Sequence, residues 1–254
     1  EYLTFTGTYK GIDVSVIGTG IGTDNVEIAI VEAYIAHEFD LKNSTRISGS
    51  TPMTFIRLGT SGGVQPDIKP GTLAIASYAL GLDSTGVYYD QAPEDEMIER
   101  IESSAEKILT DATANTSRFK GKIIPYASKA SPEVTKALAN QAKKSGASYG
   151  VGITVSSPGF YGPSSRYIVG LKNTLPDIKG SLSELNVDGL KVLNMEMESS
   201  LLFHLCSQMG YHAGTICTVI STSTESDAVV NYDAAIASTI KIGLKSLVEL
   251  KTST

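Results

Sequence analysis

The sequence predicts an α/β fold in which helices cover both faces of a mixed, mostly parallel central sheet, giving three layers. Apolar runs typical of strands alternate along the chain with segments of helical periodicity. Several of these runs show no alternation of polar and apolar residues, which is typical of strands buried on both faces. Neither a linker nor an internal repeat divides the 254 residues, so we expect residues 1–254 to form a single domain.

Each element is predicted from its own residues. Alternation over residues 1–5 and a β-branched run over 12–17 predict two strands, the second ending in a glycine-rich turn at 18–22. Helical spacing follows over residues 26–35, and residues 55–58 predict a short strand that ends in a second glycine-rich segment. The remaining elements are expected at 72–79 (strand), 94–112 and 131–145 (helices), 148–155 and 192–195 (strands), 198–209 (helix), 215–221 (strand) and 234–250 (helix).

Composition and charge exclude several classes of function. Basic residues number 21 and acidic residues 27, for a formal net charge of -6, and there is no basic cluster suited to nucleic acid. Neither an apolar run approaching the ~18 residues of a membrane span nor a secretory signal pattern appears, so we expect a cytoplasmic protein with no membrane partner. The two cysteines, Cys206 and Cys217, and scattered histidines such as His204 predict core packing and no metal site.

The turn at residues 18–22 is a weak match to a dinucleotide-binding fingerprint. Thr23 occupies the place of the last glycine, and no ribose-binding acid follows a second strand. A tight turn between a strand and a helix is the favoured interpretation. Its backbone N–H groups, such as that of Gly20, are able to face an anion.

The segment Gly59-Thr60-Ser61-Gly62-Gly63 allows two interpretations. It matches the Gly-x-Ser-x-Gly elbow of hydrolases, but the following residues 65–71 cannot begin the helix that this elbow requires. A phosphate-binding loop fits better, because Arg57 ends an apolar strand where its burial is costly without an anion or carboxylate. The alternative is that Arg57 pairs with a buried carboxylate of the protein.

Two further segments carry candidate binding residues. Glu196 and Glu198 lie where a strand gives way to a helix, and the helix dipole accounts for one acid there. The second suits a carboxylate that accepts two sugar hydroxyls; a glycosidase pair competes, but the two side chains are expected to diverge. In the loop at 157–167, Phe160 and Arg166 suit a planar, electron-rich ring.

Four segments in this order resemble the nucleoside phosphorylase superfamily, and most closely its uridine phosphorylase branch. They are residues 18–22, 55–66, 160–166 and 195–199. The resemblance implies the three-layer fold of that family. It also implies phosphorolysis of uridine to uracil and ribose 1-phosphate, the reaction of a pentosyltransferase in nucleoside salvage. Inorganic phosphate would be the co-substrate and no other cofactor is implied. Homodimers, alone or as three in a hexamer, would share their active sites.

The resemblance assigns roles to individual residues. The expected catalytic residues are Arg57 and Glu198. The expected phosphate-binding residues are Gly20, Arg57, Gly59, Thr60 and Ser61. The expected ribose-binding residues are Thr60, Met197 and Glu198. The expected base-binding residues are Phe160, Ser164, Arg166 and Ser223.

The resemblance also bears on the start of the chain. The family's first strand, its glycine-rich phosphate loop and an arginine that completes the phosphate site of the neighbouring subunit are expected to precede Glu1. Glu1 itself matches a carboxylate ligand of a monovalent cation in the uridine branch, although Asn25 replaces a serine of that site.

The base-binding residues depart from the uridine pattern. Ser164 replaces a glutamine and is too short for its two-point amide contact. Residues 221–224 replace an Asn-Arg pair, so a second base-side arginine is missing. Residues 215–219 resemble the purine branch, whose following Ser-Asp is also absent. The alternatives are therefore a purine nucleoside phosphorylase or nucleosidase, and a nucleoside-binding homologue with little turnover.

Overall fold

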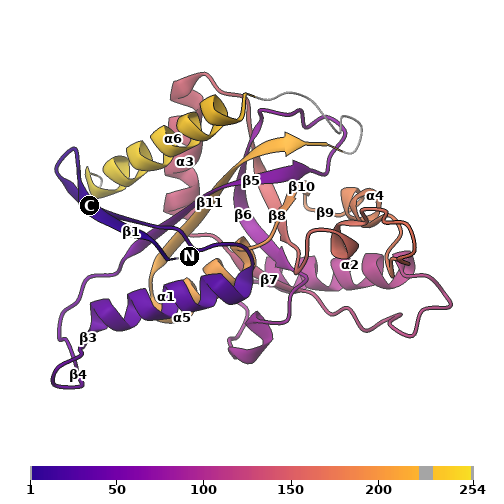
Figure 1. Ribbon diagram of the computed structural model, residues 1–254, viewed down its shortest axis with the longest axis horizontal. Helices are drawn as coiled ribbons and strands as arrows, with labels where there is room; N and C mark the ends of the chain where they lie inside the picture. Colours follow the sequence, from indigo (N-terminus) through magenta and orange to yellow (C-terminus); the bar gives the residue numbers. More distant parts are fainter. Residues whose placement is uncertain (1, 223–230, 253–254) are drawn as a thin grey trace.

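A mixed β-sheet lies at the centre of the computed structural model, which describes residues 2–222 and 231–252 (Figure 1). The strands that form it are β5 (Thr54–Gly63), β6 (Leu73–Gly81), β7 (Tyr126–Lys129), β8 (Tyr149–Ser156), β9 (Asn186–Val187), β10 (Leu190–Glu196) and β11 (His212–Ser221). They pair in the order β11-β5-β10-β8-β6-β7, with β9 added to β10. Because β6 also pairs with β11, the strands from β11 to β6 close into a barrel-like ring.

The sheet combines parallel and antiparallel pairing, as the sequence predicts. β5 runs parallel to β11, and β8 runs parallel to both β6 and β10. β5 with β10, β6 with β7 and β11, and β9 with β10 run antiparallel. The two longest ladders are the parallel ones of β5 with β11 and of β6 with β8. β6 is buried along most of its length, which explains why its sequence is a continuous apolar run.

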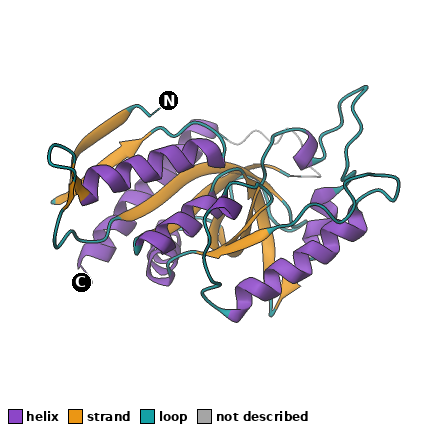
Figure 2. Ribbon diagram, turned by 90° about the horizontal axis from the view of Figure 1, so that it is seen from below, coloured by secondary structure: helices purple, strands orange, loops and turns teal. Residues whose placement is uncertain are grey.

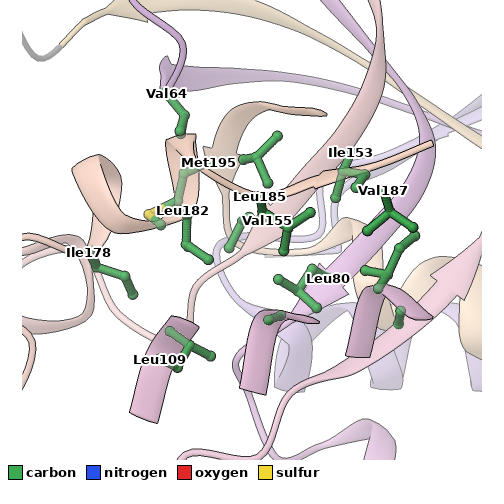
Figure 3. Close-up of a cluster of buried hydrophobic side chains, with 14 of the residues drawn as sticks. Val64, Leu80, Leu109, Ile153, Val155, Ile178, Leu182, Leu185, Val187 and Met195 are labelled. Atoms are coloured by element: carbon green, nitrogen blue, oxygen red, sulfur yellow. The ribbon is translucent and has the colours of Figure 1, made fainter. Parts of the chain in front are cut away.

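Helices cover this sheet in three pairs (Figures 1 and 2). α1 (Thr23–Glu38) packs with α5 (Ser199–Met209) on one side, and α3 (Pro132–Ser145) packs with α6 (Tyr232–Thr252) on the opposite side. α2 (Glu96–Ala112) and α4 (Ile178–Ser183) cover one end. Each pair encloses its own hydrophobic cluster, and Figure 3 shows the one beneath α2 and α4. None of the described helices combines the length and hydropathy needed to span a membrane.

The first two strands stand apart from the central sheet. β1 (Thr4–Tyr9) and β2 (Ile12–Ile17) form an antiparallel hairpin that pairs with no other described strand. β3 (Phe39–Asp40) and β4 (Thr45–Arg46) form a second, much shorter hairpin after α1. The alternation and the β-branched run predict β1 and β2, but not their separation from the sheet.

The end of β5 differs from the sequence-based expectation. The strand does not stop at Leu58 but continues to Gly63, because residues 59–62 still pair with β11 and Gly62 and Gly63 pair with β10. Arg57 therefore lies within a strand and not at its end. Sequence reasoning also missed the short β7 and β9, together with the 3-10 turns η1 (Gly86–Tyr88) and η2 (Gly162–Ser164).

Candidate active site

Arg57 lies at the centre of a buried group of charged side chains. Its Nη1 is 2.9 Å from Glu196 Oε2, and its Nη2 donates to Glu198 Oε2. Nη1 also lies 2.9 Å from Cys217 Sγ on the neighbouring strand β11. The guanidinium folds back over Gly59, where a Cβ atom would come within 2.7 Å of Nη1. This conformation of Arg57 therefore requires glycine at position 59.

Glu196 ends β10 and caps the start of α5. Its carboxylate accepts the Glu198 N–H at 3.0 Å and the Ser199 N–H at 3.1 and 3.2 Å. It also accepts the Ser156 hydroxyl at 2.6 Å. Negative charge is favoured at a helix N-terminus, so this acid has the structural role that the sequence predicts for one of the pair. Its carbonyl accepts the Ser157 N–H at 2.8 Å, so the loop after β8 begins beside the same residue.

Glu198 occupies the position between β10 and α5, with φ -141° and ψ -27°. Its Oε1 accepts the Gly22 N–H at 2.7 Å, while Oε2 contacts Arg57. Gly22 has a φ of 100°, a conformation that only glycine adopts readily. The glycine-rich turn at 18–22 thus contacts a carboxylate of the protein through Gly22. Gly20, expected to bind phosphate, lies exposed in the same turn.

The two carboxylates converge, although the sequence-based expectation is that they diverge. β10 ends at Glu196, so the alternation of side chains along a strand does not decide where Glu198 points. The backbone at Glu198 then turns its side chain toward the same guanidinium. The pairing of Arg57 with buried carboxylates, which the sequence leaves open as an alternative, describes this arrangement.

Burial and charge set the protonation of this group. Burial alone lowers the pKa of Arg57. The negative charge of Glu196, with weaker effects of Cys217 and Glu198, raises this pKa by more than burial lowers it, so the net shift is upward. Burial raises the pKa of Glu198; the charge of Arg57 opposes the rise, Glu196 adds to it, and the net direction is again upward. Burial raises the pKa of the Cys217 thiol to about 12. One cation therefore faces two carboxyl groups, and the raised pKa of Glu198 favours a proton on that group.

The hydroxyl residues that follow Arg57 lie on β5. Ser61 Oγ is buried and has no hydrogen-bond partner among the described residues, and Thr60 is half-buried. An unpaired buried hydroxyl costs about 1–3 kcal/mol, which a ligand that accepts its proton would recover. Met197, expected to hold ribose, is half-buried between the two glutamates. No helix follows Ser61 directly, so the hydrolase elbow is excluded, as the sequence indicates.

The loop after β8 carries the residues expected to bind a base. The Arg166 guanidinium lies 3.5 Å from the centroid of the Phe160 ring and also donates to the Phe160 carbonyl. Phe160 is 55% exposed, so the ring with its cation is accessible. The Ser164 hydroxyl donates to the Gly159 carbonyl at 3.4 Å and thus faces its own loop.

The structure brings the two expected catalytic residues into direct contact. Arg57 and Glu198 meet across 141 positions of sequence. Ser223, expected to bind the base, and Glu1, expected to bind a cation, lie outside the described residues. A separate cavity of about 190 Å³, lined by residues of α2, β7 and α5 that include His204, contains neither Arg57 nor Glu198.

Several contacts of the site were missed by sequence reasoning. Cys206 and Cys217 are buried free thiols, as expected, but Cys217 also contacts the guanidinium. The strand register carries the signal for this contact, because Cys217 pairs with Gly59, over which Arg57 folds. The Gly22 contact has no such signal, because it joins a turn to a residue of a distant helix junction.

Comparisons with known proteins place the chain in a family. Its residues 1–248 match the family described as Phosphorylase superfamily. A uridine phosphorylase from Thermococcus kodakarensis is 31% identical over 221 residues, which cover 87% of this chain and 62% of that protein. The chain thus spans slightly less than two thirds of the length of this relative. A uridine phosphorylase from Haemophilus influenzae is 29% identical over 227 residues, which cover 89% of this chain and 71% of that protein.

A solved structure agrees with the sequence matches. The crystal structure of a Trypanosoma brucei nucleoside phosphorylase, which shows uridine phosphorylase activity, resembles the fold with a TM-score of 0.83 and 28% identity. The resemblance covers 97% of this chain and 83% of that one. Because the family match extends over almost the whole sequence and the fold agrees with that structure, the chain belongs to the phosphorylase superfamily.

Proposed function

We propose that this protein catalyses the phosphorolysis of uridine, in which inorganic phosphate displaces uracil and gives ribose 1-phosphate. One observation carries the proposal. Arg57 on β5 and Glu198 at the start of α5, which the family resemblance assigns to phosphate and ribose, are in direct contact. The similarity to two uridine phosphorylases over 87% and 89% of the chain supports the same reaction.

The reaction needs no side-chain nucleophile. A phosphate oxygen forms a bond to ribose C1′ while the C1′–N1 bond breaks, and the electron pair of that bond stays on the base. Positive charge develops on the sugar, as in the oxocarbenium-like transition states of glycoside cleavage. Phosphate held by Arg57 stabilises this cation from a fixed position, which is a large contribution in a water-poor site. The uracil anion then takes a proton from water.

Phosphate and the carboxylates compete for one guanidinium in this proposal. Nη2 of Arg57 exchanges Glu198 for a phosphate oxygen, while Glu196 stays in place because it also caps α5. Glu198 remains bound to the Gly22 N–H through Oε1, and its freed Oε2 accepts the ribose hydroxyls. Substrate binding thus converts an internal salt bridge into two substrate contacts.

The single cation of the site supports an active site shared between subunits. A phosphate beside two carboxylates needs more than the single cation of Arg57, and the family resemblance supplies an arginine from the neighbouring subunit. The proposal therefore includes a homodimer, alone or as three in a hexamer. The first hairpin supports an interface, because Leu3, Phe5 and Val16 are 67%, 67% and 59% exposed.

Inorganic phosphate is the only co-substrate that the proposed reaction needs. The monovalent cation suggested by Glu1 stays part of the proposal, as does a role in nucleoside salvage in the cytoplasm. Two buried cysteines without a disulfide, Cys206 and Cys217, suit a reducing compartment.

The proposal is tested by measuring uracil released from uridine, with and without phosphate, beside the same assay on inosine. We expect uracil and ribose 1-phosphate to form only when phosphate is present. Arg57→Lys keeps a positive charge but loses the two-pronged geometry of the guanidinium. It is expected to raise KM for phosphate roughly 10- to 100-fold.

The alternatives give different results in this assay. Base release without phosphate would identify a nucleosidase. Faster phosphate-dependent base release from inosine than from uridine would identify a purine phosphorylase. Thermal stabilisation by nucleosides without turnover would identify a binding protein. An unchanged KM for phosphate in Arg57→Lys would remove Arg57 from the phosphate site.

A further inference from the structure

Lys179 is a partly buried cation that lacks an anionic partner among the described residues. It is the second residue of α4, and neither an ion pair nor a hydrogen bond joins its side chain to residues 2–222 or 231–252. Burying an ammonium group without an anion costs free energy. Among the residues that the structure describes, no contact that stabilises the fold therefore accounts for a lysine at this position.

The ammonium group lies against the glycine-rich end of β5. A Cβ atom on Gly62 would lie 3.0 Å from Lys179 Nζ and 3.4 Å from Ser221 Oγ at the end of β11. A side chain at position 62 would therefore require the ammonium to shift by a few tenths of an ångström. Arg57 folds over Gly59, three residues earlier on the same strand, so two cations approach one glycine-rich segment at different positions.

Lys179 is also tied to the loop that carries Arg166. The Ser165 hydroxyl accepts the Ile178 N–H at 2.9 Å and donates to the Leu175 carbonyl at 2.6 Å, which joins this loop to the first turn of α4. Ile178 is fully buried in the cluster beneath α4, so the helix start is fixed (Figure 3). Burial and, secondarily, the charge of Arg166 lower the pKa of Lys179.

We propose that Lys179 is a base-recognition residue, which binds a carbonyl oxygen of the pyrimidine and stabilises the negative charge of the departing uracil. The inference rests on the proposed phosphorolysis. When the C1′–N1 bond breaks, its electron pair spreads from N1 onto the carbonyl oxygens, which are acceptors suited to an ammonium donor. Lys179 supplies a cation from α4 near Gly62, which Ser221 also approaches.

The test compares K179M with K172M, which removes an exposed lysine from the segment before α4. K179M is expected to lower kcat/KM for uridine roughly 10- to 100-fold, because a charge-assisted hydrogen bond is lost. KM for phosphate should not change, since Arg57 is intact. K172M should match the native protein in both values.

A second substrate distinguishes charge stabilisation from a merely structural role. The base of 5-fluorouridine is a better leaving group and needs less stabilisation, so the defect of K179M should be smaller with it than with uridine. K179R should recover part of the activity. Because K179M removes a charge that has no anionic partner within residues 2–222 and 231–252, its midpoint of thermal unfolding should equal or exceed that of the native protein.

Binding of free uracil, measured by calorimetry, separates this inference from the proposed function. Phosphorolysis by the native protein with equal kcat/KM in K179M would overturn the inference and leave the function standing. If the native protein shows no turnover, uracil binding that K179M weakens would still support the contact. Equal uracil binding by both proteins, or none by either, would overturn it.

Discussion

At the scale of single residues, the site depends on how one guanidinium is shared. Arg57 and Glu198 are recognisable in the sequence because each is a charged residue in an apolar setting. Their direct contact is not recognisable in the sequence, because it depends on a backbone turn at Glu198 and on the Gly22 N–H, 176 positions away. Glu196 looks equivalent to Glu198 in the sequence, yet its bonds to Ser199 and Ser156 make it a helix cap.

Because Glu198 is a buried acid beside Arg57, we expect pH to change the stability of the native protein relative to that of Glu198→Gln. Burial raises the pKa of Glu198 above the value of about 4.3 for an unfolded chain. A group with a raised folded pKa contributes stability that is complete below the unfolded pKa and is lost as the pH rises through the folded pKa. The native protein should therefore lose stability relative to Glu198→Gln as the pH rises from about 4.3 toward neutrality.

Urea unfolding of both proteins across this pH range measures the difference. Titrating groups remote from Glu198 are common to the two proteins and cancel in the comparison, whereas Glu196, which interacts with Glu198, contributes to the difference. The variant should also lose turnover while keeping its fold, because Arg57 retains Glu196. A difference in unfolding free energy that does not change with pH would mean that the pKa of Glu198 is not raised in the folded state.

At the scale of elements, the site is held by the junction where β8, β10 and α5 meet. Apolar periodicity predicts these three elements to within two residues at their ends. It gives no information on the glycine-rich end of β5, because glycines and hydroxyl residues carry no hydrophobic pattern. That segment is a strand only because β11 and β10 lie beside it, which is a property of the assembled sheet.

Ser156 at the end of β8 is the link that we predict to be most sensitive. Its buried hydroxyl donates to Glu196 at 2.6 Å and accepts the Ser200 N–H at 2.9 Å. Ser156→Ala leaves the Ser200 N–H without this partner, which should lower the free energy of unfolding by about 1–3 kcal/mol. It should also lower kcat, because Glu196 positions the start of α5.

Thermal unfolding and steady-state rates of the variant test this link. Ser164→Ala is the matched control, because its hydroxyl makes one long hydrogen bond of 3.4 Å within a loop. It should leave the free energy of unfolding nearly unchanged. Equal losses of stability in the two variants would show that the junction does not depend on the Ser156 hydroxyl.

At the scale of the whole molecule, the first hairpin presents an apolar surface to solvent. The register places Phe5 opposite Val16, with Leu3 on the same face, whereas Thr6 and Ser15 share the other face and hydrogen-bond at 2.9 Å. A two-stranded hairpin is marginally stable in isolation. Its exposed apolar face and the single cation of the site both favour the proposed second copy of the chain, which would cover the hairpin and add a cation.

Phe5→Asp should therefore act on assembly and activity together. A carboxylate in the apolar face would be buried without a partner in the proposed dimer. The variant dimer should therefore dissociate at a higher protein concentration than the native dimer. KM for phosphate should rise with dissociation, because the cation that we propose for the neighbouring subunit would be lost. Light scattering and phosphate kinetics, followed over a range of protein concentrations, measure the two effects.

Thr6→Asp, on the opposite face of the same strand, is the control for this substitution. It introduces the same charge one residue away and should leave the mass and KM for phosphate of the native protein unchanged. If Phe5→Asp alone shifts both quantities, and at the same protein concentration, the apolar face and the phosphate site belong to one interface. A monomeric native protein with full activity would instead show that Arg57 binds phosphate without help from a second chain.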